Sequence, residues 1–189
     1  MLLRIAREVC LAKYRNFPLS PFDVNTYEEF FYYPKIISGG WYYLHSNTKR
    51  EFSNILKMEF TKLIRACKFE SLIFFGDKTT PWVTKLSAKR TDYVSIIKAI
   101  EYFEINQLGK KFNGGVQVGI TDLPEFIKHF YSIVRSDASF HGFYFSDENQ
   151  KLLGSIHYSG EVLFQTLDLE FNSQFEKYLR STQFKFDKK

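Results

Sequence analysis

The sequence predicts an α+β fold in which helices pack on a mainly antiparallel sheet. Short apolar runs bounded by turn residues, typical of strands, alternate with longer runs that have the periodicity of amphipathic helices. The composition, 44% hydrophobic and 25% charged, is that of an ordinary globular protein. With 189 residues the chain is long enough for a sizeable core, and we expect a single domain over residues 1–189.

A first group of elements is expected within about 36–90. Its helix should begin at Thr48, because the Thr48 hydroxyl can accept from the amide three residues later while Glu51 reaches back, which is the pattern of a capping box. The expected elements are a strand at 41–44, a helix from 48 to about 67, a strand at 72–75, a turn at 76–81 and a returning strand at 82–86.

A second group, within about 112–170, repeats this order. Its expected elements are a strand at 116–120, a helix that begins at 122–125, a strand at 143–145, a turn at 146–150 and a strand at 151–158. Each group opens on a glycine pair, Gly39-Gly40 or Gly114-Gly115, which we expect to supply positive backbone angles. The match indicates a tandem duplication of a β-α-β-β unit, with a helix at about 92–108 between the two halves. Chance similarity of apolar patterns is the alternative.

The ends of the chain carry the remaining expected elements. They are a helix from Leu3 to Tyr14, a proline-punctuated connection at 17–21, a strand or pair of strands within 160–171, and a short helix that a capping box opens at 173–176. Arg4, Arg7 and Glu8 interrupt the apolar run that a signal peptide would need, and no stretch approaches the ~18 to 20 apolar residues of a membrane helix. We therefore expect a cytoplasmic protein with no membrane partner.

Aromatic residues are unusually frequent, with 21 Phe, 12 Tyr and 2 Trp. A surplus of such rings suits either a Phe-rich core or an exposed binding face. The two cysteines, Cys10 and Cys67, fall among apolar neighbours, which favours buried small hydrophobic residues over a disulfide, although a disulfide stays open at this point.

Charge is spread unevenly along the chain, whose formal net charge is +5. Residues 1–113 hold 18 Lys or Arg against 11 Asp or Glu, whereas residues 122–176 hold nine acids and three bases. Such a dipole steers a charged partner. Two solvated faces without a partner fit these counts equally well.

No pattern of residues indicates catalysis, metal binding or a cofactor. The histidines, which form no zinc-binding spacing, are His45, His129, His141 and His157. The glycine pairs lack the spacing of a phosphate-binding loop. One enzymatic alternative remains, a metal-free phosphodiesterase in which His141 and His157 act as acid and base. His157-Tyr158-Ser159 supplies one triplet of a two-histidine phosphoesterase, but the required second triplet is missing.

Nucleic-acid binding is the other alternative, because basic residues are interleaved with aromatic ones in the first part of the chain. The candidate phosphate contacts are Arg4, Arg7, Lys13, Arg15, Lys49, Arg50, Lys57, Lys62 and Arg65. Glu51 and Glu59 dilute this set, and no signature of a known nucleic-acid-binding motif is present. We therefore do not expect nucleic acid to be the partner.

Four segments give the chain a resemblance to the immunity proteins of bacterial contact-dependent growth inhibition systems. They are FNGGV (112–116), LPEFIKHFY (123–131), GFYFSDENQ (142–150) and LLGSIHYSGEVLF (152–164). The resemblance implies a non-enzymatic protein that binds and neutralises the C-terminal toxin domain of a cognate effector, with a nuclease as the expected toxin. It carries no binding residue over to a numbered position. The net positive charge departs from the acidic character associated with neutralising nucleases.

The expected toxin-binding residues combine acids at turns with neighbouring aromatic side chains, since turns often carry recognition. They are Tyr144, Asp147, Glu148, His157, Tyr158 and Glu161. The turn at 146–150 is expected to be exposed. Reversing the charges of Asp147 and Glu148 should then weaken binding of a basic toxin and leave the fold intact.

Overall fold

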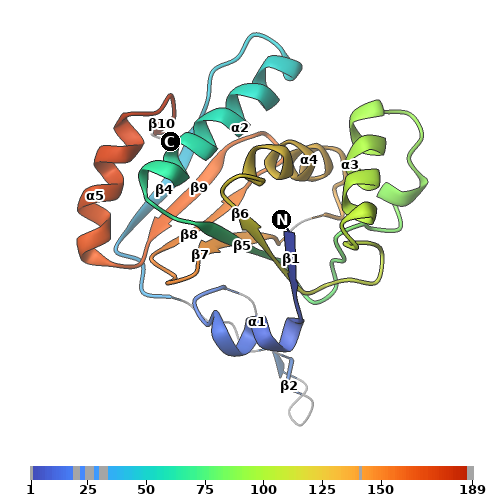
Figure 1. Cartoon of the computed structure of the whole chain (residues 1–189), viewed down its shortest axis with the longest axis horizontal. Helices are drawn as coiled ribbons and strands as arrows, with labels where there is room; N and C mark the ends of the chain where they lie inside the picture. The colour runs from blue at the N-terminus through green and yellow to red at the C-terminus, as the bar shows by residue number, and fades with distance from the viewer. Residues whose placement is uncertain (1, 19–21, 24–27, 30–33, 141, 187–189) are drawn as a thin grey trace.

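An eight-stranded sheet lies at the centre of the structure, a computed structural model that describes residues 2–18, 22–23, 28–29, 34–140 and 142–186 (Figure 1). The strand order is β1-β6-β5-β7-β8-β9-β4-β10, and all neighbouring pairs are antiparallel. The strands are β1 (Leu2–Ile5), β4 (Ser38–Tyr43), β5 (Ser71–Phe75), β6 (Gly115–Gly119), β7 (Tyr144–Asp147), β8 (Leu152–Ile156), β9 (Val162–Thr166) and β10 (Lys185–Phe186). Two further strands, β2 (Phe22–Asp23) and β3 (Glu28–Glu29), pair with each other.

Helices lie on both faces of this sheet (Figure 1). They are α1 (Arg7–Lys13), α2 (Lys49–Ala66), α3 (Val94–Ile105), α4 (Leu123–Ser136) and α5 (Leu169–Arg180), with a short 3-10 helix at Ser87–Lys89. The helices α2 to α5 share the core cluster on one face, and α1 packs on the other. The predicted α+β class is therefore confirmed. No helix among the described residues is long and apolar enough to cross a membrane.

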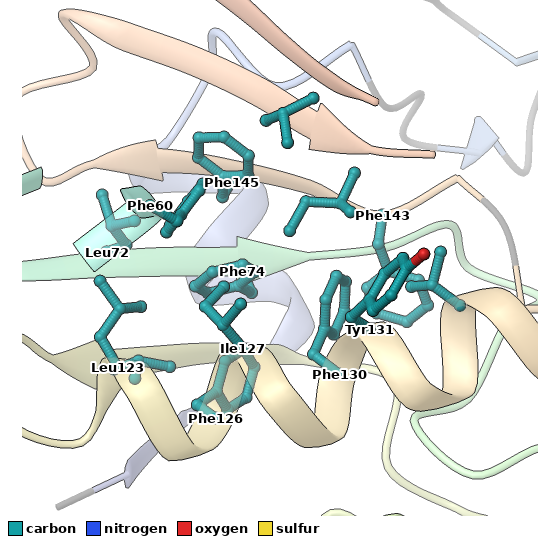
Figure 2. Close-up of a cluster of buried hydrophobic side chains, with 14 of the residues drawn as sticks. Phe60, Leu72, Phe74, Leu123, Phe126, Ile127, Phe130, Tyr131, Phe143 and Phe145 are labelled. Atoms are coloured by element: carbon teal, nitrogen blue, oxygen red, sulfur yellow. The ribbon is translucent and has the colours of Figure 1, made fainter. Parts of the chain in front are cut away.

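Phenylalanine fills most of the main core. Phe74 on β5 lies at its centre, with ring centroids 4.6 Å from Phe126 and 5.3 Å from Phe130, both on α4 (Figure 2). Phe145 on β7 and Trp82 complete the cluster and are also fully buried. Burial of each such side chain stabilises the fold by about 1.5–3 kcal/mol. Much of the aromatic surplus is thus core.

The tandem duplication is not confirmed. The order β4-α2-β5 does match β6-α4-β7, but the two pairs of strands are placed differently in the sheet. One strand, β5, separates β6 from β7, whereas β7, β8 and β9 separate β4 from β5. The first group also lacks its fourth strand, because residues 82–86 form no ladder. Instead, the Trp82 ring enters the core and its indole Nε1 donates to the Gly114 carbonyl at 2.9 Å.

Local signals set some helix ends and not others. The expected N-cap at Thr48 is confirmed, because Thr48 Oγ1 accepts from the Glu51 amide at 3.2 Å. The reciprocal half of the capping box differs, since the Glu51 carboxylate accepts from the Asn47 amide at 3.1 Å and the Thr48 amide donates to the Ser46 hydroxyl. The expected box at 173–176 is wrong, since α5 begins at Leu169 and the Asp168 carboxylate accepts from the Phe171 amide at 2.7 Å. The expected helix at 3–14 is also wrong in its first part. Its apolar residues form β1, whose partner strand β6 lies more than a hundred residues later.

The glycine pairs lie where neighbouring atoms approach the backbone too closely for a Cβ atom. Among the described glycines, only Gly142 and Gly160 have positive φ, so the expected role of Gly39-Gly40 and Gly114-Gly115 is wrong. At Gly115 a Cβ atom would lie 2.4 Å from the Cys10 Sγ atom. Glycine on β6 therefore lets α1 approach the sheet.

Gly115→Ala should lower the free energy of unfolding by about 1–3 kcal/mol, the usual cost of overpacking a core. In a Cys10→Ala background the colliding sulfur is gone, so the same substitution should cost at least about 1 kcal/mol less. Urea unfolding of the four proteins gives this coupling. Gly109→Ala is the matched control, because a Cβ there meets nothing within 4 Å. Equal losses at positions 109 and 115 would contradict the role of Gly115.

The cysteines are buried on opposite faces of the sheet. Cys10 lies in the cluster under α1, and Cys67 lies in the main core. Both are free, and burial raises the pKa of Cys10 to about 11 and that of Cys67 to about 12. Their expected role as small hydrophobic residues is confirmed, and the sheet between them excludes a disulfide.

Candidate functional site

Two adjoining hollows lie where β8 turns into β9 beside the C-terminal end of α4. The first, called the apolar hollow, has a volume of about 450 Å³ and is lined by Trp41, Val134, Arg135, Ser136, Asp137, Ala138, Phe140, Gly142, Phe143, Ser155, Ile156, His157 and Tyr158. The second, called the polar hollow, has a volume of about 470 Å³ and is lined by Ser46, Asn47, Thr48, Phe52, Tyr131, Arg135, Tyr158 and Ser159. Arg135 and Tyr158 line both hollows and so form their common wall.

Three aromatic side chains stand at the mouth of the apolar hollow. The sheet register aligns Trp41 with Leu163 and Leu163 with Ser155, which places Trp41 beside the end of β8. The Trp41 and His157 rings meet edge to face with centroids 5.8 Å apart, and His157 and Tyr158 lie 4.1 Å apart. Trp41 is 38% exposed and Tyr158 is 64% exposed. Such rings offer large, rigid contact area to a partner.

Arg135 is the cation of this site. It lies in the last turn of α4, four residues after Tyr131, and its side chain is half-buried. Within the described part of the chain its guanidinium has no hydrogen bond and no ion pair. Burial raises the pKa of the Tyr131 hydroxyl, and the nearby Arg135 charge opposes that rise. The five N–H donors of Arg135 are therefore open to a ligand from outside the described residues.

Hydrogen bonds hold the turn that carries Tyr158. The Ser159 hydroxyl lies 2.7 Å from His157 Nδ1 and 3.0 Å from Glu161 Oε2. Gly160 completes the turn with φ +99°. A Ser-His-acid triad needs the hydroxyl and the carboxylate on different ring nitrogens. Here Glu161 Oε2 lies 3.7 Å from the same Nδ1, so the geometry is that of a braced turn.

The structure brings three of the six expected site residues together. His157 and Tyr158 line the hollows, and Glu161 braces their turn. Tyr144 is half-buried and packs in the cluster under α1. Asp147 and Glu148 lie at the other end of β8.

The expectation that Asp147 is exposed is wrong. Its side chain is 1% exposed and accepts from the amides of Asn149, Lys151 and Leu152 at 2.9, 2.7 and 2.8 Å. The carboxylate thereby satisfies the backbone of its own turn. Glu148 is exposed, but its Oε1 accepts from Ser71 and Gln117, each at 2.6 Å.

Other acids of the 122–176 segment are also used internally. Asp137 is buried and accepts from the hydroxyls of Thr84, Ser87 and Ser139. These donors hold the pKa of Asp137 below its ordinary value although burial alone would raise it. Asp168 caps α5. The excess of acids in this segment therefore does not imply an acidic binding surface.

Of the other three histidines, two pack against neighbouring side chains and one lies outside the described residues. His129 is buried, stacks on Tyr102 at 4.4 Å and meets Glu125 Oε1 at 2.8 Å. His45 packs edge to face on Tyr43. His141 lies outside the described residues, so its pairing with His157 stays a prediction. In the part of the chain that is described, no three His, Cys, Asp or Glu side chains form a metal-binding group.

The basic residues proposed for nucleic acid are partly used within the fold. Arg7 is buried, donates to the carbonyls of Gly76 and Asn113 at 2.9 and 3.1 Å, and lies over the Phe75 ring. Arg4 lies over the Phe112 ring. A separate hollow of about 400 Å³ beside Arg4 is also lined by Lys110 and Lys111. The side chains of Lys49 and Arg50 lie outside the described residues.

Sequence reasoning missed Trp41 and Arg135. Alternation along 41–43 indicates that Trp41 and Tyr43 share a face, and helical spacing indicates that Tyr131 and Arg135 share one. Neither signal says that these two faces meet. Their meeting depends on the sheet order, which places β4 beside β9.

Comparison of the chain with models of known protein families gives no match. Neither the curated proteins nor the solved structures give a match.

Proposed function

We propose that this chain is a non-enzymatic binding protein that holds a protein partner at the surface formed by Trp41, Arg135, His157 and Tyr158. The observation that carries the proposal is the grouping of a tryptophan, a tyrosine and an arginine around adjoining hollows, the arginine having no hydrogen bond or ion pair to any residue that the structure describes. These three residue types are enriched where most of the binding energy of protein interfaces is concentrated. The braced turn supports the proposal further, since it holds Tyr158 ready for contact.

The proposed partner is the C-terminal toxin domain of a cognate bacterial effector, which this chain would neutralise in the cytoplasm. The resemblance of four segments to immunity proteins supports this choice of partner. The nuclease activity of that toxin stays a prediction. The shared contact of Ser159 and Glu161 with one nitrogen of His157 favours binding over hydrolysis.

Co-expression with the product of the gene immediately upstream tests this function. The two proteins should elute as a stable one-to-one complex in size-exclusion chromatography with light scattering, and the toxic activity of the upstream product should disappear in the complex. Binding of a labelled oligonucleotide tests the alternative function, nucleic-acid binding, which the hollow lined by Arg4, Lys110 and Lys111 suggests. Separate elution of the two proteins, together with oligonucleotide binding near physiological salt, would replace the proposal with nucleic-acid binding.

A further inference from the structure

The charged side chain shared by the two hollows is a cation. Arg135 is half-buried in the wall between the two hollows, and its guanidinium has no hydrogen bond or ion pair among the described residues. The nearest acid in the lining, Asp137, does not compensate it, because Thr84, Ser87 and Ser139 occupy the Asp137 carboxylate. A half-buried charge of this kind gains most from an opposite charge supplied by a partner.

The guanidinium fork of arginine matches the geometry of a carboxylate, to which it donates two parallel hydrogen bonds. Beside it, the polar hollow offers Ser46 and Asn47, and the apolar hollow offers a wall of Trp41 and Phe143. The volume of the apolar hollow, about 450 Å³, is at the lower end of the range of small-ligand pockets and has room for one aromatic side chain. The site therefore combines a carboxylate position with an adjoining ring position, since Arg135 itself lines the apolar hollow.

We infer that this site binds an acidic segment of the protein partner, with one carboxylate on Arg135 and a neighbouring aromatic side chain in the apolar hollow. The inference rests on the proposed function for the partner's identity as a protein. From the sequence, the acids of residues 122–176 were expected to attract a basic toxin. Asp137, Asp147 and Asp168, however, are used in hydrogen bonds within the fold. The expected charge of the partner surface is therefore reversed. The partner surface at this contact is acidic.

A favourable interaction with the helix dipole is the structural alternative for Arg135, since cations stabilise the last turn of a helix. Arg180 provides a matched control. It lies in the last turn of α5, is exposed, and likewise has no hydrogen bond or ion pair among the described residues, but it lines neither hollow. A role limited to the helix end predicts equal behaviour of the two arginines.

The first experiment uses 3-phenylpropionate as the probe and 3-phenylpropionamide as its neutral counterpart. Binding is followed by NMR through the indole N–H of Trp41, which is distinguished from the buried Trp82 by its loss in Trp41→Phe. The acid should bind at least about fivefold more tightly than the amide. Arg135→Met should abolish that preference, Arg135→Lys should keep part of it, and Arg180→Met should leave it unchanged. Equal binding of acid and amide, or a preference that survives in Arg135→Met, overturns the inference.

The second experiment separates this inference from the proposed function. In the complex with the upstream gene product, Arg135→Met should weaken binding by about tenfold or more, because a charge-assisted pair is lost, and Arg180→Met should not. A complex that forms normally with Arg135→Met leaves the proposed function standing and overturns the acidic contact. Probe binding that depends on Arg135 without any protein complex overturns the protein partner and makes a free aromatic carboxylate the ligand.

Discussion

Asp147→Lys is expected to lower the free energy of unfolding by about 3–5 kcal/mol. The carboxylate is almost fully buried and accepts from three backbone amides in the β7–β8 turn, one of which, that of Leu152, is itself buried. Lysine removes the acceptor from all three donors and places a cation where water cannot reach it. Denaturant unfolding measures the loss. This result would replace the earlier expectation that charge reversal in this turn leaves the fold intact.

Glu148→Lys is the matched control, because it makes the same change of charge one residue further on at an exposed position. Its loss should be smaller, about 1–2 kcal/mol, because it removes only the hydrogen bonds that Glu148 accepts from Ser71 and Gln117. Asp147→Asn should fall between the two variants, since one oxygen can still accept from Lys151 and Leu152. Similar losses for Asp147→Lys and Glu148→Lys would contradict the structural role of Asp147.

The pH dependence of Asp147→Asn follows from the same contacts. Burial raises the pKa of Asp147 above its ordinary value, although hydrogen bonds from backbone amides oppose the rise. A raised pKa means that this titration favours the folded state at low pH, and that the advantage is lost as pH rises through the native pKa. Asparagine does not ionise. The difference in unfolding free energy between the wild type and Asp147→Asn should therefore narrow as pH rises above about 4, the ordinary pKa of an aspartate, and urea unfolding at a series of pH values measures it.

Elements that depend on neighbours in the sequence could be predicted. The unbroken apolar run 72–75 identified β5, and the hydroxyl and carboxylate spacing at Thr48 and Glu51 identified the start of α2. Elements that depend on distant partners could not. The chain at 82–86 has the composition of a strand, but the contact of Trp82 with Gly114 across the core takes it out of any ladder.

The candidate site likewise contains residues that local sequence signals predict and residues that only the tertiary structure brings there. The turn after β8 could be predicted because Ser159 and Gly160 are local turn signals, although the expected strand at 151–158 extends two residues past the end of β8 at Ile156. The structure places His157 and Tyr158 at the hollows. Trp41 and Arg135 join them only through the order of strands and the placement of α4. The net charge of the 122–176 segment did not predict its surface, because carboxylates such as those of Asp147 and Asp168 accept hydrogen bonds from backbone amides, and a count of acids does not distinguish these from exposed charges.

Replacing both Trp41 and Tyr158 by alanine should weaken the complex with the upstream gene product by about a hundredfold, equivalent to about 2.7 kcal/mol. Together the two rings supply the exposed aromatic area at the mouth of the apolar hollow. Tyr158 is mostly exposed and its loss should barely change the melting temperature, so Tyr158→Ala alone shows whether the effect is on binding. Tyr93→Ala, at another exposed tyrosine, 57% exposed and outside both hollows, is the matched control.

Isothermal titration calorimetry of these variants against the purified upstream product tests the location of the binding surface most directly. We expect Tyr93→Ala to bind as the wild type does, Tyr158→Ala to bind at least about tenfold more weakly, and the double variant to bind about a hundredfold more weakly. Wild-type affinity in a folded Trp41→Ala Tyr158→Ala protein would contradict the account, because the partner would then bind elsewhere on the molecule.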